Sequence, residues 1–226
     1  MQTWFFILHG MGFSWGKPSW PWNNLLAMSK QDAQTEAIRQ AVIKLKPVDL
    51  PARCAALKLP APVDGRIQLR AFGTDFHLIT DTFELFISKT GAPAKDADRI
   101  LILHLLLCDL PLTASDELIT FRDFPGGAFY LEPFLSRTVR PLVKRYGNRL
   151  DELKAVMNRF DFQPLELGDF SARIHAVGCL YVTLVYRLGD DEFPAEAELF
   201  FNAPVKRAFC AEDAAVLAGR ICFGLF

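Results

Sequence analysis

The first third of the chain changes from a helical to a strand-like spacing of apolar residues. Over residues 32–46, apolar side chains recur every three or four positions, which predicts an amphipathic helix that ends before Pro47. Residues 51–57 start with a proline and predict a second, short helix. Apolar and polar residues then alternate over residues 66–88, and this alternation predicts two or three antiparallel strands.

The middle of the chain has helical patterns only. Residues 99–108 consist almost entirely of leucine and isoleucine, which indicates a helix inside the core rather than a strand. Residues 131–146 carry apolar side chains on one helical face and predict a helix that is kinked at Pro141 and ended by Gly147. A further helix is predicted over residues 151–160.

The last third returns to strands and closes with a helix. Aromatic and β-branched residues predict strands at 172–177 and 180–188, and a partner strand at 197–201. Residues 211–223 predict the closing helix. Because strand runs are grouped apart from helix runs, the order predicts an α+β fold, with antiparallel sheet packed against several helices. We expect a single compact domain over residues 28–226.

The first 27 residues differ from the rest of the chain. They contain no acidic residue, and all four tryptophans precede Met28: Trp4, Trp15, Trp20 and Trp22. The apolar run near the start is too short for a signal peptide, and far below the about 20 residues that span a bilayer. Three explanations of residues 1–27 stay open: a start codon upstream of a natural start at Met28, a disordered extension, or an aromatic anchor on a membrane surface.

Composition and charge narrow the functional classes. Hydrophobic residues make up 51% and charged residues 23%, as in an ordinary globular protein. With 25 basic and 26 acidic residues the net charge is −1, which argues against a nucleic-acid partner. The five cysteines lack the close spacing of metal clusters and indicate free thiols in a reducing cytoplasm. They are Cys54, Cys108, Cys179, Cys210 and Cys222. Nothing in the sequence indicates a particular cofactor.

Several segments resemble a bacterial and archaeal family of a domain of unknown function, number 3786. These are "ILILHLLL", "ITFRDFPGGAFY", "GDDEFP" and "EDAAVL", at 100–107, 119–130, 189–194 and 212–217. The resemblance covers roughly residues 35–223 and implies no established reaction. Members are typical of anaerobes, and some carry a fused iron–sulfur segment of the type found in corrinoid enzymes of one-carbon metabolism. This chain lacks the cysteine cluster that such a segment needs.

The Pro-Gly-Gly segment is the most site-like stretch of the sequence. Gly126 and Gly127 let main-chain N–H groups approach a ligand, and Arg122 is a potential clamp for a carboxylate or a phosphate. Asp123 and Tyr130 flank these residues and complete the candidate ligand site. The alternative interpretation is a tight structural turn in which Arg122 pairs with an acid.

A basic stripe follows on the polar face of the helix predicted at 131–146. Arg137, Arg140 and Lys144 are spaced at helical intervals, and Arg145 lies beside them. This face would suit an anionic ligand or an acidic protein partner. An ordinary solvated helix face is the alternative.

An acidic turn provides the third candidate. Asp190, Asp191 and Glu192 are consecutive, and their carboxylates would suit a hard cation or acid–base catalysis. Acids are also common in solvated turns. We expect this turn to lie beside the Arg122 segment, because a partly buried guanidinium needs a carboxylate partner.

His104 and Cys108 form a weaker candidate, a potential metal-ligand pair at helical spacing on the leucine-rich helix. A hydrogen-bonded core histidine is the alternative. Together these observations favour a non-catalytic module that binds a small anionic molecule near Arg122. Two further hypotheses remain, a protein–protein adaptor that uses the basic stripe and an enzyme that uses carboxylate acid–base chemistry.

Overall fold

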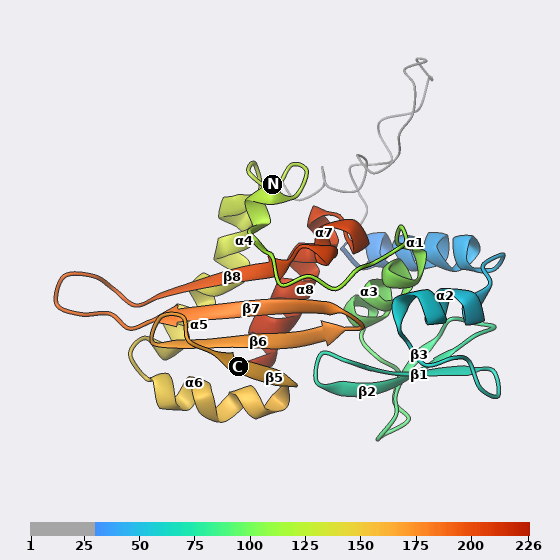
Figure 1. Ribbon diagram of the computed structural model, residues 1–226, viewed down its shortest axis with the longest axis horizontal. Coiled ribbons are helices and arrows are strands. Elements are labelled where there is room, and N and C mark those ends of the chain that lie inside the picture. Colours follow the sequence, from blue (N-terminus) through green and yellow to red (C-terminus); the bar gives the residue numbers. More distant parts are fainter. Residues whose placement is uncertain (1–29) are drawn as a thin grey trace, which may run out of the picture.

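The computed structural model describes residues 30–226, and Figure 1 shows their arrangement. The predicted boundary at Met28 and the expectations about residues 1–27 lie outside these described residues. Within them, the strands form one antiparallel sheet in the order β3-β2-β1-β6-β7-β8-β4, and β5 pairs with β6. The predicted α+β fold, with one compact domain, is therefore confirmed.

Six of the eight described strands lie where the sequence predicted them, and β4 and β5 were not predicted. The first group is β1 (Arg66–Ala71), β2 (Thr74–Ile79) and β3 (Leu85–Ile87). The second group is β4 (Leu118–Ile119), β5 (Phe162–Leu165), β6 (Phe170–Val177), β7 (Leu180–Arg187) and β8 (Glu196–Asn202). In β1 every second side chain is buried, as expected when one face of a strand meets the core. The central strand β7 is buried over nearly its whole length.

The helices pack around this sheet. They are α1 (Lys30–Leu45), α2 (Leu50–Leu57), α3 (Asp96–Leu107), α4 (Leu131–Arg137), α5 (Val139–Tyr146), α6 (Leu150–Val156), α7 (Pro204–Ala208) and α8 (Ala211–Gly224). In Figure 1, α8 crosses behind β6, β7 and β8, while α1, α2 and α3 lie at the end of the molecule nearest β1. The leucine-rich run of α3 is buried from Ile100 to Leu103, which confirms its predicted place in the core.

Two polar contacts join α3 to α8 across an otherwise apolar interface. Near the start of α3, the buried Asp98 accepts a hydrogen bond of 2.7 Å from Arg220. Near its end, His104 Nδ1 lies 2.8 and 2.9 Å from the two carboxylate oxygens of Asp213. The order of these contacts along the two helices shows that α3 and α8 run antiparallel.

The helix predicted over 131–146 is in fact two helices. The break lies at Thr138, whose φ of −122° and ψ of −88° are not helical, and the predicted kink at Pro141 is wrong. Pro141 instead occupies the first turn of α5, where a missing N–H costs nothing. Because a proline ring clashes with the carbonyl group four residues earlier, the helix has to restart before Pro141.

Candidate functional site

The Pro-Gly-Gly segment forms a tight turn that positions aromatic rings in the core. A Cβ atom on Gly127 would lie 2.0 Å from the carbonyl oxygen of Phe121, so only glycine fits at this position. The turn buries Phe121 and Phe124, and the Phe121 ring stacks on Phe134 with a centroid distance of 4.0 Å. These contacts explain Gly127, Phe121 and Phe124 in structural terms.

The charged residues of the same segment face different surroundings. The Asp123 carboxylate accepts hydrogen bonds from the main-chain N–H and the hydroxyl of Thr120, at 2.7 and 2.8 Å. These two bonds lower the pKa of Asp123. Arg122 is exposed and forms no ion pair within residues 30–226. Tyr130 is half-buried and precedes the first residue of α4.

The acidic turn lies at the tip of the loop between β7 and β8. Asp190 Oδ1 accepts hydrogen bonds from the main-chain N–H groups of Glu192 and Phe193, at 2.9 and 2.8 Å, which lower the pKa of Asp190. Asp191 and Glu192 are exposed. The Asp190 carboxylate therefore stabilises the turn in which it lies.

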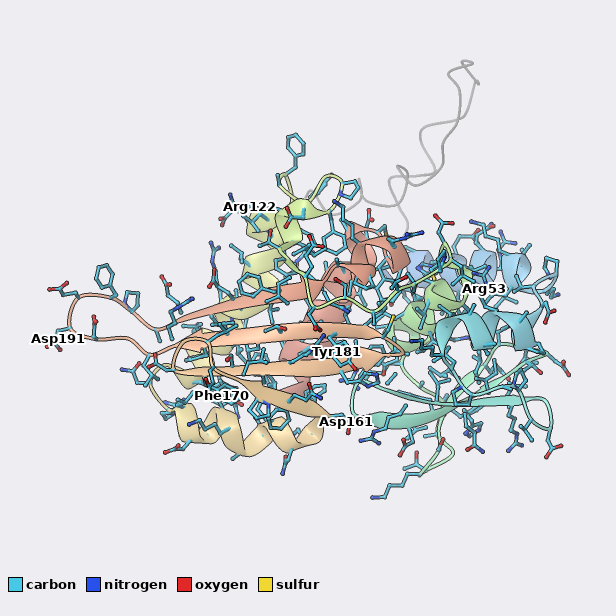
Figure 2. All side chains as sticks on the ribbon, in the orientation of Figure 1. Arg53, Arg122, Asp161, Phe170, Tyr181 and Asp191 are labelled. Atoms are coloured by element: carbon cyan, nitrogen blue, oxygen red, sulfur yellow. The ribbon has the colours of Figure 1, made fainter. Side chains whose placement is uncertain are left out.

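The expected pairing of Arg122 with the acidic turn is wrong. Figure 2 shows Arg122 and Asp191 well apart, with Asp191 at the far end of the long loop. The sheet explains the separation, because the acidic turn leads into the first residue of β8. The segment before Arg122 instead pairs with the last residues of β8, Phe201 and Asn202.

His104 and Cys108 have different surroundings and share no ligand. His104 contacts Asp213, which also lies 3.4 Å from the thiol of Cys210. Cys108 follows α3 and is buried, which raises the pKa of its thiol to about 11. Within residues 30–226, no three His, Cys, Asp or Glu side chains are arranged to hold a metal ion. The sequence did not indicate Asp213, because it lies 109 residues from His104.

A hollow of about 550 Å³ opens to solvent where α5, α6 and the residues after α8 meet. Its lining residues are Pro141, Lys144, Arg145, Arg149, Glu152 and Phe226. Lys144 and Arg145 belong to the basic stripe that the sequence predicted, and Arg149 precedes α6. A second hollow, of about 460 Å³, is lined by residues of the 60–68 segment and contains one cation, Arg66.

We call the hollow formed by α5, α6 and Phe226 the basic hollow. Several hydrogen bonds hold the main chain of its wall. Tyr146 donates its hydroxyl to the carbonyl oxygen of Leu225. Arg159 donates to the carbonyl oxygens of Gly224 and Phe226, at 3.0 and 2.9 Å. The guanidinium of Arg145 lies 5.9 Å from the centroid of the Phe226 ring. The aromatic wall and the adjacent cation are thereby held in place.

The cations of the basic hollow differ in their pairing. Arg149 pairs with Glu152 at 2.9 Å. Lys144 and Arg145 are exposed, and neither forms an ion pair with any residue that the structure describes. Of the other stripe residues, Arg140 pairs with Glu132, whereas Arg137 is exposed, has no carboxylate partner among residues 30–226 and does not line the hollow. Among residues 30–226, Lys144 and Arg145 are therefore the cations of the basic hollow that form no ion pair with a carboxylate side chain.

A family model matches residues 49–223 of the chain, and its description is "Domain of unknown function (DUF3786)". The chain belongs to this family. The DUF3786 match begins at the residue that caps α2 and ends inside α8, so it includes Lys144, Arg145 and Arg149 but not Phe226. The family motifs around His104 and Asp213 meet in the contact between α3 and α8. No curated protein and no solved structure matches the chain.

Among the described helices, none is long and apolar enough to cross a bilayer.

Helical spacing in the sequence predicted two of the cations of the basic hollow, Lys144 and Arg145. Arg149 and Phe226 were not predicted, because they belong to other elements and reach the hollow only through tertiary packing.

Proposed function

We propose that the DUF3786 domain is a non-catalytic binding module that holds a small anionic molecule in the basic hollow. The observation that carries this proposal is the pair of cations without carboxylate partners, Lys144 and Arg145, at the edge of a concave surface. An anion placed there gains charge-assisted hydrogen bonds without displacing an existing ion pair. The proposal keeps the ligand class expected from the sequence and moves the site from Arg122 to the basic hollow.

The fixed surroundings of the hollow support this proposal. Tyr146 and Arg159 hold the main chain of residues 224–226, so the wall needs little rearrangement when a ligand binds. Lys144 and Arg145 project from the same helix, and Arg149 projects from the start of the next. A site on such short, packed elements loses less entropy on binding than a site on a free loop.

The other two hypotheses draw less support from the geometry. The enzyme hypothesis needs poised carboxylates, but Asp123 and Asp190 form local hydrogen bonds in turns. The adaptor hypothesis is favoured by the exposed rings of Phe129 and Phe193, which are 89% and 66% exposed, although they lie on separate loops. An acidic protein segment would use the same cations as a small anion, and the experiment below distinguishes the two.

The cellular context belongs to the same proposal. We place the module in the cytoplasm, because the five cysteines are free and three of them are buried. A link to anaerobic corrinoid or one-carbon metabolism rests on the family resemblance alone.

Calorimetric titration with inorganic pyrophosphate tests the proposed function. We expect binding that weakens as salt is added, because the contacts are ionic and solvent-accessible. Lys144→Gln should weaken this binding about tenfold by removing one charge-assisted contact, and it should not disturb the fold because Lys144 is exposed and has no ion-pair partner among residues 30–226. Arg137→Gln is the matched control, since Arg137 is a similarly exposed cation outside the hollow.

Two results would overturn the proposal. Absence of measurable heat at millimolar pyrophosphate would exclude a small-anion site and leave the adaptor hypothesis. An effect of Arg122→Gln larger than that of Lys144→Gln would return the site to the Pro-Gly-Gly turn.

A further inference from the structure

We infer that the ligand of the basic hollow carries an aromatic ring next to its anionic group, as nucleotides and aryl phosphates do. This inference rests on the proposed function and adds the class of ligand. It is drawn from three features of the hollow: its size, its aromatic wall, and the arrangement of cations on one side of that wall.

The size of the hollow exceeds what an inorganic anion needs. The hollow has a volume of about 550 Å³ and is shallow and widely open to solvent, so it leaves room for a ligand larger than an inorganic anion and encloses it only in part. The lining also includes the apolar side chains of Pro141 and Phe226, which an inorganic anion cannot use. A ligand that contacts the whole lining therefore has an apolar part as well as a charged part.

The aromatic wall indicates that the apolar part is a flat ring. Phe226 is half-buried, so one part of its side chain packs on the protein while another part lines the hollow. Phe223 meets the Phe226 ring edge-on, with centroids 5.6 Å apart and an interplanar angle of 78°. This contact borders the ring on one side, and Arg159 bonds the main chain that carries it. An aromatic wall favours a stacked ring, and stacking of this kind tolerates different bases.

The cations lie where the charged part of such a ligand would be. Arg145 contacts both the Phe226 and the Tyr146 rings, at 5.9 and 5.5 Å, so positive charge borders the aromatic wall directly. Lys144 adds a second charge that lacks a carboxylate partner among the described residues. Two cations without an ion-pair partner among residues 30–226 suit the two or more negative charges of a diphosphate or of a phosphate monoester.

The test compares ligands that share the anion and differ in the ring. Calorimetric titrations of the full chain use inorganic pyrophosphate against adenosine diphosphate, and methyl phosphate against phenyl phosphate. We expect each ring-bearing ligand to bind about tenfold more tightly than its partner. Phe226→Leu should bring the affinities within each matched pair close together, and the ratio within a pair is the readout, because a change in anion binding alone affects both members alike. Phe129→Leu removes an exposed ring that does not line the hollow and serves as the control.

Each outcome separates the two proposals. Equal binding of the matched ligands by the unmodified chain would overturn the ring inference and leave the anion site intact. Absence of binding by all four ligands would overturn both. If Phe226→Leu weakened pyrophosphate and adenosine diphosphate equally, the ring would have only a structural role, and the inference would be wrong. A preference for phenyl phosphate without one for adenosine diphosphate would restrict the ligand to aryl phosphates.

Discussion

Single residues of this protein combine deep burial with ionisable groups. Cys108 is 7% exposed, and its burial raises the pKa of the thiol to about 11. Burial also raises the pKa of Cys222, to about 12. At neutral pH these thiols are protonated and therefore poor nucleophiles and poor metal ligands. The weak metal hypothesis for Cys108 is accordingly less favoured than its role as a small apolar side chain.

The raised pKa of Cys108 predicts a loss of stability in alkali. The unfolded thiol releases its proton near the ordinary value of 9.0, whereas the folded thiol keeps it until about pH 11. The unfolded state therefore binds fewer protons between these values, and the free energy of unfolding falls as pH rises through that window. Denaturant titrations from pH 8 to 11 should show that the free energy of unfolding falls by about 1–2 kcal/mol less in Cys108→Ala than in the unmodified chain. Identical pH profiles for the two proteins would contradict the burial argument.

At the scale of elements, the antiparallel helices α3 and α8 are both largely buried and contact each other through polar side chains. Their interface is apolar except for the contacts of Asp98 with Arg220 and of His104 with Asp213. The Asp98 side chain is only 5% exposed, so its charge depends on Arg220 for compensation. These contacts fix the register of two helices whose leucine and alanine side chains would otherwise permit sliding.

Removing the cation of the buried pair should be costly. Arg220→Ala leaves the Asp98 carboxylate buried without a partner, and we expect the free energy of unfolding to fall by about 3 kcal/mol. Arg187→Ala provides the comparison, because the Arg187–Glu198 pair is about half exposed and should contribute less than about 1 kcal/mol. Urea denaturation of both variants measures the difference. Equal losses would show that the α3–α8 pair has no special role.

The elements that the sequence predicted are those with long, regular apolar patterns. The helices at 99–108 and 211–223 and the strands at 66–88 agree with the structure to within a few residues. By contrast, β5 was missed because Pro164 argues against a strand, although an edge strand such as this one tolerates proline. Very short elements such as β4 carry too few residues for a pattern.

The candidate site was predicted less completely than the fold. Local spacing revealed Lys144 and Arg145 because both lie on one helix. The contribution of Phe226 depends on the contacts of residues 225–226, which follow α8, with Arg145 and Tyr146 of α5, and no local pattern reports these contacts. The acidic turn failed as a partner of Arg122 for the same reason, since the sheet register sets the distance between them.

At the scale of the whole molecule, the sheet has a narrow joint between its two halves. Only Ala71 and Val177 pair directly between β1 and β6, with one further hydrogen bond from Phe72 to Ala176. Next to this joint, Gly73 packs against the main chain of Arg159. Arg70 reinforces the contact with hydrogen bonds of 2.6 and 2.8 Å to Asp161.

Gly73→Ala tests the importance of this joint. A Cβ atom there would lie 2.1 Å from the carbonyl oxygen of Arg159, and φ is +72°. Gly65→Ala is the matched control, because φ is +70° but the nearest atom is 3.8 Å away. We expect Gly65→Ala to lower the free energy of unfolding by about 1–2 kcal/mol through backbone strain, and Gly73→Ala to lower it by at least about 2 kcal/mol more. Chemical denaturation of both variants decides, and equal losses would contradict the packing argument.

A chain that begins at Met28 should retain the stability of the full chain. The family match starts at Asp49, well after Met28. We expect the same denaturation midpoint for both chains. A midpoint lowered in the shorter chain would show that residues 1–27 contribute to the fold.

The distribution of aromatic residues separates two optical signals. All four tryptophans precede Met28, whereas all four tyrosines lie in the described fold, with Tyr146 and Tyr186 fully buried. Emission excited at long wavelength therefore comes from the first 27 residues alone, and tyrosine emission comes from the core. Energy transfer from tyrosine to tryptophan would be efficient only while the two parts of the chain are near each other. One fluorescence spectrum thus measures how close residues 1–27 are to the folded body.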